Sequence, residues 1–223
     1  MVIFMLYTLI MGMLFTVPHL AILHETIRNL YFHVPMWFGM TLLLICAVVN
    51  SMLYLNKGKQ KHDILASAFT KVALLFGCCG ITTGMVWAQF TWGVWWNNDP
   101  KENAAAVGLL IYFAYFILRG SIDDIDRRAR VGAVANIIFF FVFIPIIFIV
   151  PRLTDSLHPG NGGNPGFSAY DLDSNMRLVF YPAVLGWSGL GCWIVSVIAR
   201  TEILKRKILF HHSNPAKSLD SSI

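Results

Sequence analysis

Residues 131–150 read VGAVANIIFFFVFIPIIFIV, a run of twenty residues without a single charge. A helix needs about 20 predominantly apolar residues to cross the hydrocarbon core of a bilayer, so this run predicts a transmembrane helix. Its internal Pro145 does not argue against a helix, because neighbouring helices in a membrane can satisfy the backbone groups that a proline frees. The whole chain is similar in character, since 57% of its 223 residues are hydrophobic and only 13% are charged. This composition excludes an ordinary water-soluble domain.

Five further apolar runs predict, together with the first, an all-α, polytopic membrane protein with six transmembrane helices and no separate soluble domain. The N-terminal run has neither a preceding basic region nor a clear cleavage site, so we expect a retained anchor instead of a signal peptide. The four cysteines all fall inside apolar stretches, where we expect buried structural thiols and no disulfide framework. The six runs are 2–23, 30–55, 64–88, 104–118, 131–150 and 178–199.

The run 104–118 is the shortest of the six. Its 15 uncharged residues reach roughly 22 Å as a helix, which is less than the ~30 Å thickness of the hydrocarbon core. The residues just before it supply an N-cap aspartate at Asp99, a first-turn proline at Pro100 and a glutamate at Glu102, in the order of a capped helix start. We therefore expect this helix to begin at Pro100.

The distribution of Lys and Arg predicts the orientation of the helices. Twelve of these residues lie in the loops 56–63 and 119–130 and in the tail 200–223, whereas four lie in the loops 24–29, 89–103 and 151–177. Cytoplasmic loops carry the excess of basic residues, so the first group and both termini are expected in the cytoplasm. The net charge of +5 is thereby assigned to membrane topology, and no nucleic-acid partner is expected.

Four of the seven tryptophans, including Trp92, Trp95 and Trp96, lie within residues 87–96, next to the predicted outer loop 89–103. Indole rings favour the headgroup level of a bilayer, so an aromatic belt is one interpretation. If the segment is helical, Trp92, Trp95 and Trp96 share one face, which suits a flat apolar ligand. The residues themselves leave both interpretations open.

Two histidines are predicted on the same side as this tryptophan-rich segment. His33 lies at the outer end of the second helix, and His158 lies in the outer loop 151–177, which is rich in Gly, Pro, Asn and Asp. Two neutral imidazoles from separate segments are suited to bind a haem iron on opposite faces. His19 and His24, near the outer end of the first helix, are alternatives, and each histidine also has a purely structural interpretation.

The stretch 92–102, WGVWWNNDPKE, resembles the tryptophan-rich motif of the haem-handling proteins of cytochrome c biogenesis. The length and six-helix layout resemble the haem exporter protein C branch of that family, over nearly the whole chain. His33-Val-Pro and Leu157-His158 are similar to the two histidine positions of the family. Asn98 departs from the pattern, because the family usually has a tryptophan there. Asp-Pro-Lys-Glu is closer to the cytochrome c synthase branch, whose additional helices and large soluble domain this chain lacks.

The resemblance implies that His33 and His158 ligate the iron of a transiently bound haem b, and it implies no role for His19 or His24. The residues that the resemblance places against the haem are Trp92, Trp95, Trp96 and Asp99. Asp99 also has the structural role of a helix cap, and a helix N-terminus suits a carboxylate such as a haem propionate.

The implied function is haem binding at the outer face of a bacterial inner membrane and delivery to a periplasmic haem chaperone. The expected partners are the subunits of an ABC-type exporter and a small membrane subunit, and no enzymatic activity is expected. Three alternatives remain: a component of a cytochrome c haem lyase or synthase, a b-type electron-transfer cytochrome, and a polytopic transporter without haem. The small outer segments argue against the synthase, and the positions of the two histidines, outside helix interiors, argue against the b-type cytochrome.

Overall fold

The computed structural model describes residues 1–20, 22–158 and 172–213, with side chains described as far as Leu209. It contains helices and no strand within these residues. Three short helical segments accompany the α-helices: η1 (His24–Asn29), the π-helical η2 (Pro145–Ile149) and η3 (Val150–Arg152). The α-helices are α1 (Val2–Leu14), α2 (Leu30–Lys57), α3 (Gln60–Trp92), α4 (Pro100–Gly120), α5 (Ile125–Ile144) and α6 (Ser174–Ser213).

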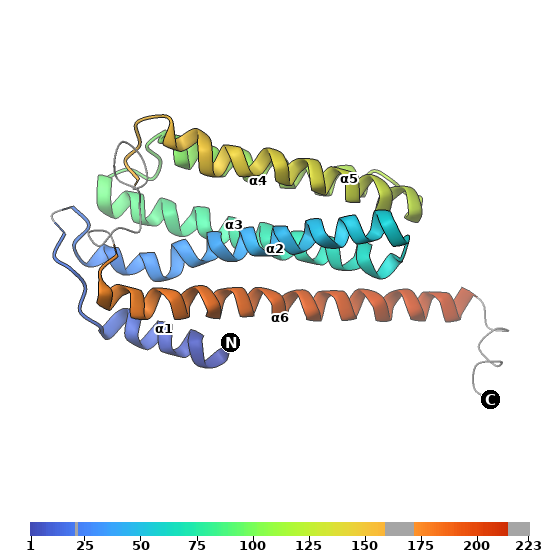
Figure 1. Ribbon diagram of the computed structural model, residues 1–223, viewed down its shortest axis with the longest axis horizontal. Coiled ribbons are helices and arrows are strands. Elements are labelled where there is room, and N and C mark those ends of the chain that lie inside the picture. Colours follow the sequence, from blue (N-terminus) through green and yellow to red (C-terminus); the bar gives the residue numbers. More distant parts are fainter. Residues whose placement is uncertain (21, 159–171, 214–223) are drawn as a thin grey trace.

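The helices run side by side along one long axis, as expected for a bundle of membrane helices (Figure 1). In this view α4 and α5 lie above α2 and α3, and α6 and the short α1 lie below them. α2 packs against α3, α5 and α6, so it is the central helix of the bundle. The main apolar core includes Met40, Leu43 and Leu44 from α2, together with Phe76 from α3 and Tyr112 from α4.

Small residues allow α2, α3 and α4 to approach closely. A Cβ atom on Gly39 would lie 2.9 Å from the ring of Phe76, and a Cβ atom on Gly77 would lie 2.8 Å from the sulfur of Met40. Side-chain packing and close approach drive helix association in a membrane, because lipid is as apolar as the helices themselves. These two glycines therefore set the spacing between α2 and α3.

Five helical stretches are long and apolar enough to cross a membrane, and they correspond to the second to sixth predicted runs. The beginning predicted for the shortest of them is confirmed, because α4 begins at Pro100 and Asp99 accepts a hydrogen bond from the backbone N–H of Lys101. The five stretches are His24–Lys57, Gln60–Trp92, Pro100–Gly120, Ile125–Arg152 and Ser174–Leu209.

The predicted helix 2–23 differs from the structure. α1 contains 13 residues and ends at Leu14, and Phe15 has an extended backbone with φ −71° and ψ 148°. Pro18 limits how far this helix could continue, because a proline lacks a backbone N–H and disfavours helix in the residue before it. A helix of this length reaches roughly 20 Å, which is less than the ~30 Å core. The structure therefore supports five candidate spans and does not confirm the sixth.

The cysteines also differ from the prediction that they are buried. Cys46 and Cys78 are half-buried, and Cys79 and Cys192 are exposed on the outside of the bundle. The reason is that apolar side chains of a membrane helix can face lipid as well as the protein interior, so an apolar sequence environment does not predict burial.

Candidate functional site

A cavity of about 160 Å³ lies at the end of the bundle where α2 begins, α3 ends and α4 begins. It contains both predicted histidine ligands, although His33 and His158 are separated by most of the chain. We call it the histidine cavity. Its lining residues are His33, Trp37, Ile81, Gly84, Met85, Trp96, Lys101, Glu102, Ala105, Ile147 and His158.

The ring of His33 is held by the backbone of α3. Its Nδ1 atom lies 2.9 Å from the carbonyl oxygen of Gly80 and 3.2 Å from the hydroxyl of Thr83. A carbonyl oxygen can only accept a hydrogen bond, so Nδ1 carries the proton and donates it. In the neutral ring, the Nε2 atom then keeps its lone pair, which is the state that a metal ligand requires. The rings of Trp37 and Trp87 pack edge-on against the imidazole, with centroids 6.3 and 5.9 Å away.

The ring of His158 is held by a carboxylate. Its Nδ1 atom lies 3.0 Å from Oδ1 of Asp99, and the carboxylate accepts this hydrogen bond. In the neutral form of this ring, the Nε2 atom would keep the lone pair. A carboxylate that accepts from the other ring nitrogen orients a metal-binding histidine and makes it a stronger ligand. The ring of Trp92 contacts this imidazole at a centroid distance of 5.2 Å.

Asp99 connects the start of α4 with the 151–158 segment and with the ring of His158, although only 4% of its surface is exposed. Besides His158 and the N–H of Lys101, it accepts hydrogen bonds from the backbone N–H of Leu157 at 2.7 Å and from the hydroxyl of Ser156 at 3.0 Å. Burial by itself would raise the pKa of this carboxyl, but the donors outweigh burial and hold the pKa well below its usual range. Asp99 is thus a helix cap and the anchor of the 151–158 segment, and it does not line the histidine cavity.

The predicted aromatic face of three tryptophans is not formed. α3 ends at Trp92, and Gly93 follows with φ 79°, a left-handed conformation that glycine adopts without steric cost. The chain turns there, so Trp95 and Trp96 do not continue the helical spacing. Trp96 lines the histidine cavity, whereas Trp95 is 54% exposed.

The turn after Trp96 depends on asparagines. Asn98 has φ 55°, which asparagine tolerates better than a bulky residue does. Its carbonyl oxygen accepts a hydrogen bond from Asn103, whose side-chain oxygen accepts one from the indole N–H of Trp96 at 3.2 Å. The asparagine at position 98 therefore suits the backbone that aims Trp96 into the cavity.

Several residues of the site were not predicted from the sequence, notably Gly84 and Lys101. Gly84 lies against His33, since a Cβ atom there would be 2.8 Å from Cε1 of the imidazole. Lys101 brings a cationic side chain to the cavity. The spacing of Gly77, Gly80 and Gly84, three and four residues apart, places small residues along one face of α3. That pattern could have predicted that side chains of other helices approach this face of α3 closely.

The apolar helices and this site define a class of protein: a multi-pass membrane protein in which two imidazoles share one cavity at the end of the bundle. The family described as Heme exporter protein C matches residues 1–213, and the chain belongs to this family.

Individual relatives agree with this assignment. The chain is 25% identical to Heme exporter protein C of Rhodobacter capsulatus, over 90% of this chain and 82% of the relative. It is 23% identical to Heme exporter protein C of Paracoccus denitrificans, over 82% and 76% of the two chains. A shorter similarity, 38% identity over 83 residues, links it to the cytochrome c biogenesis protein CcsA of Prochlorococcus marinus, and it covers 37% of this chain and 26% of that protein.

Proposed function

We propose that this protein binds haem b in the histidine cavity, with the iron between His33 and His158, and transfers it during cytochrome c biogenesis. One observation carries the proposal. Both imidazoles use Nδ1 as a hydrogen-bond donor, toward Gly80 and Asp99, and both line one cavity. In its neutral form, each histidine would therefore present the Nε2 lone pair to a ligand.

The donor set of the cavity suits a porphyrin better than a bare metal ion. Within the described residues, no group of three or more His, Cys, Asp or Glu side chains could hold a metal ion. Two imidazoles alone leave a metal without its remaining ligands, whereas haem would bring its own nitrogen ligands and His33 and His158 would complete the set.

The shape and charge of the cavity fit a ligand that is held only in part. Its volume of about 160 Å³ is below the roughly 300–1,000 Å³ of pockets that enclose drug-sized molecules. We infer that the iron and part of the ring enter, while the rest lies along the exposed surface near Trp95. Lys101 is the cation suited to a propionate. Partial enclosure also suits a protein that must release its ligand.

The proposed topology places the histidine cavity on the periplasmic side of a bacterial inner membrane, with both termini in the cytoplasm. The excess of Lys and Arg at the other end of the bundle supports this orientation. The N-terminal end of α1 also points toward the end of the bundle where α6 ends (Figure 1). A sixth crossing by this first segment remains part of the proposal.

In this function the protein is a binding and transfer component, not an enzyme. It would pass haem to a periplasmic haem chaperone and work with the subunits of an ABC-type exporter and a small membrane subunit. The similarity to relatives named Heme exporter protein C supports this assignment over the haem lyase or synthase alternative. The similarity to CcsA covers about a quarter of that protein, so it supports a shared segment and not a shared activity.

The test is the absorption spectrum of the full chain purified from cells supplied with haem. We expect the low-spin spectrum of a haem with two histidine ligands, altered in both His33→Ala and His158→Ala and partly restored by added imidazole. His19→Ala is the matched control, because His19 is an exposed histidine outside the cavity and its loss should change nothing. Unchanged spectra in both cavity variants would overturn the assignment of the ligands.

A further inference from the structure

A second cavity, of about 540 Å³, lies at the end of the bundle opposite the histidine cavity. It is formed where α3 and α5 begin, α4 ends and α6 passes, and we call it the basic cavity. Five of its lining side chains are cationic and two are anionic, which leaves three positive charges in excess. The charged residues are Lys71, Arg119, Arg128, Lys205, Arg206, Asp63 and Glu202.

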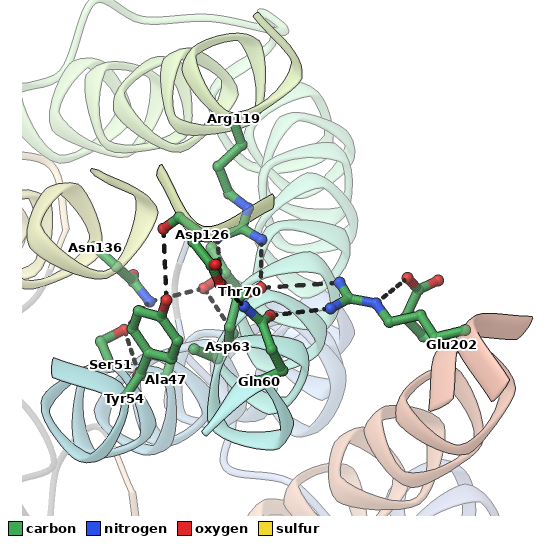
Figure 2. Close-up of polar contacts among 12 residues, drawn as sticks. Ala47, Ser51, Tyr54, Gln60, Asp63, Thr70, Arg119, Asp126, Asn136 and Glu202 are labelled. Carbon is green, nitrogen blue, oxygen red and sulfur yellow. Dashed lines mark hydrogen bonds and ion pairs between the residues drawn. The ribbon is translucent and has the colours of Figure 1, made fainter. Parts of the chain in front are cut away.

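Both carboxylates of the basic cavity are already paired with arginines (Figure 2). Asp63 is 3% exposed and accepts two hydrogen bonds from Arg119, at 2.7 and 3.1 Å. Arg206 lies 3.9 Å from the same carboxylate and donates to Glu202 at 3.0 Å. A buried charge such as that of Asp63 is costly unless it is paired, and this network provides partners for both carboxylates.

Three cations of the cavity are left over. Within the described residues, Lys71, Arg128 and Lys205 form no ion pair with a carboxylate. They come from three different helices, α3, α5 and α6, so they surround the cavity and do not form a row along one helix. Such an arrangement attracts an anion with several oxygen atoms, since each cation can donate to a different oxygen.

The walls of the basic cavity are partly apolar. Ile64, Phe116, Val197 and Ile198 line it together with the cations. Lys71 lies eleven residues into α3, which corresponds to about 16 Å along the helix axis. The cavity thus extends from the charged end of the bundle along the apolar part of the helices. α3 packs against both α4 and α6, and the cavity lies over α3 between those two helices.

We propose that the basic cavity binds an anionic phospholipid. Arg128, Lys205 and Lys71 hold the headgroup phosphate, and an acyl chain lies against Phe116 and Ile198. Basic pockets between transmembrane helices are suited to lipid headgroups of this kind. The apolar wall distinguishes a lipid from a free phosphate ion, which would gain nothing from Phe116 or Ile198. The proposal does not depend on haem binding.

The test compares two double variants of the full-length protein in detergent, each of which removes two positive charges from neighbouring positions. Arg128→Gln with Lys205→Gln removes two cations of the cavity. Arg127→Gln with Lys207→Gln is the matched control, because both residues are exposed and neither lines the cavity. Native mass spectrometry measures the phosphatidylglycerol and phosphatidylcholine that each protein retains after incubation with an equimolar mixture of the two lipids.

We expect the wild type and the control to retain more phosphatidylglycerol than phosphatidylcholine. The ratio of the two retained lipids should be at least threefold lower in the cavity variant. Equal losses in both variants would overturn the proposal, because they would indicate general surface charge. Absence of a preference in the wild type would also overturn it. A second arm measures thermal unfolding with added phosphatidylglycerol or inorganic phosphate. Stabilisation of the wild type by phosphate as large as that by the lipid would exclude a lipid site.

Discussion

The two ends of the bundle hold cavities of opposite chemistry, and a buried aspartate underlies each. At the histidine cavity, Asp99 accepts hydrogen bonds from two backbone N–H groups, a hydroxyl and an imidazole. At the basic cavity, Asp63 faces two guanidinium groups. The first aspartate orients an imidazole, and the second neutralises cations that would otherwise repel one another.

This difference shows that the same side chain has different consequences according to its donors. When a carboxylate orients a histidine, it determines which ring nitrogen is presented to a ligand. When it pairs with arginines in the low-dielectric interior, its removal leaves a buried charge without compensation. We therefore expect loss of Asp99 to alter mainly binding and loss of Asp63 to alter mainly stability.

The largest expected effect is that of Asp63→Asn. The change leaves the buried Arg119 without its carboxylate, and breaking a buried ion pair in this way costs about 3–5 kcal/mol. We expect a marked fall in the thermal unfolding temperature of the purified protein and no change in the haem spectrum of the folded fraction. Asp126→Asn is the control, because this exposed carboxylate at the same end accepts a hydrogen bond from Gln60 and should cost little. Equal unfolding temperatures for the two variants would contradict the prediction.

The next largest effect is expected from Asp99→Asn. An asparagine offers one acceptor oxygen and a donating amide to a position that now receives four donors, so the imidazole of His158 loses its orientation. Loss of such a partner typically costs about 10–100-fold in affinity for a metal centre. Haem titration of the apo protein measures this change.

Asp124→Asn is the matched control for Asp99→Asn. Asp124 caps α5 through the N–H of Arg127 at 2.7 Å, and it contacts no histidine. Both variants keep a side chain that can cap the helix, because asparagine is about as good an N-cap as aspartate, and only the first should lose haem affinity. If both variants bind haem equally well, the role assigned to Asp99 is wrong.

A smaller effect is expected from Gly84→Ala. The added Cβ atom meets Cε1 of His33 at 2.8 Å, so the imidazole has to leave its rotamer, which costs on the order of 0.5–1.5 kcal/mol. Haem affinity should fall by up to about tenfold. Gly120→Ala, where a Cβ atom meets nothing within 4 Å, should bind haem as the wild type does. Equal haem affinities of the two variants would contradict the prediction for Gly84.

The smallest effect is the response of the Asp99 anchor to acid. The pKa of this carboxyl is held below its usual value of about 3.9, which it has in the unfolded chain. Its contribution to stability is therefore fully present above about pH 3.9 and is lost only as the pH falls through the lower pKa of the folded state. Hydrogen exchange at the N–H of Leu157 should show a constant protection factor from pH 7 to pH 4.5. The N–H of Asn103, which donates to the backbone oxygen of Asp99, is the internal reference. Selective loss of protection at Leu157 above pH 4.5 would contradict this prediction.

Local features of the sequence determined the class of fold. The apolar runs predicted five helices that the structure contains, because a helix that crosses a membrane requires an apolar sequence of a certain length. Asp99, Pro100 and Glu102 predicted the start of α4, because a helix cap involves residues only a few positions apart. The prediction that His33 and His158 are ligands came from a resemblance, not from their spacing.

Tertiary structure decided the rest. The turn at Gly93 separates Trp92 from Trp95 and Trp96, and no helical periodicity indicated where α3 would end. The shared cavity of His33 and His158 depends on how α2 and the 151–158 segment pack around α3 and α4, and the Nδ1 partner of each imidazole comes from a distant part of the chain. An amino-acid sequence records which groups can donate or accept, but only packing brings together groups that lie far apart along the chain and so decides which nitrogen is left for a ligand.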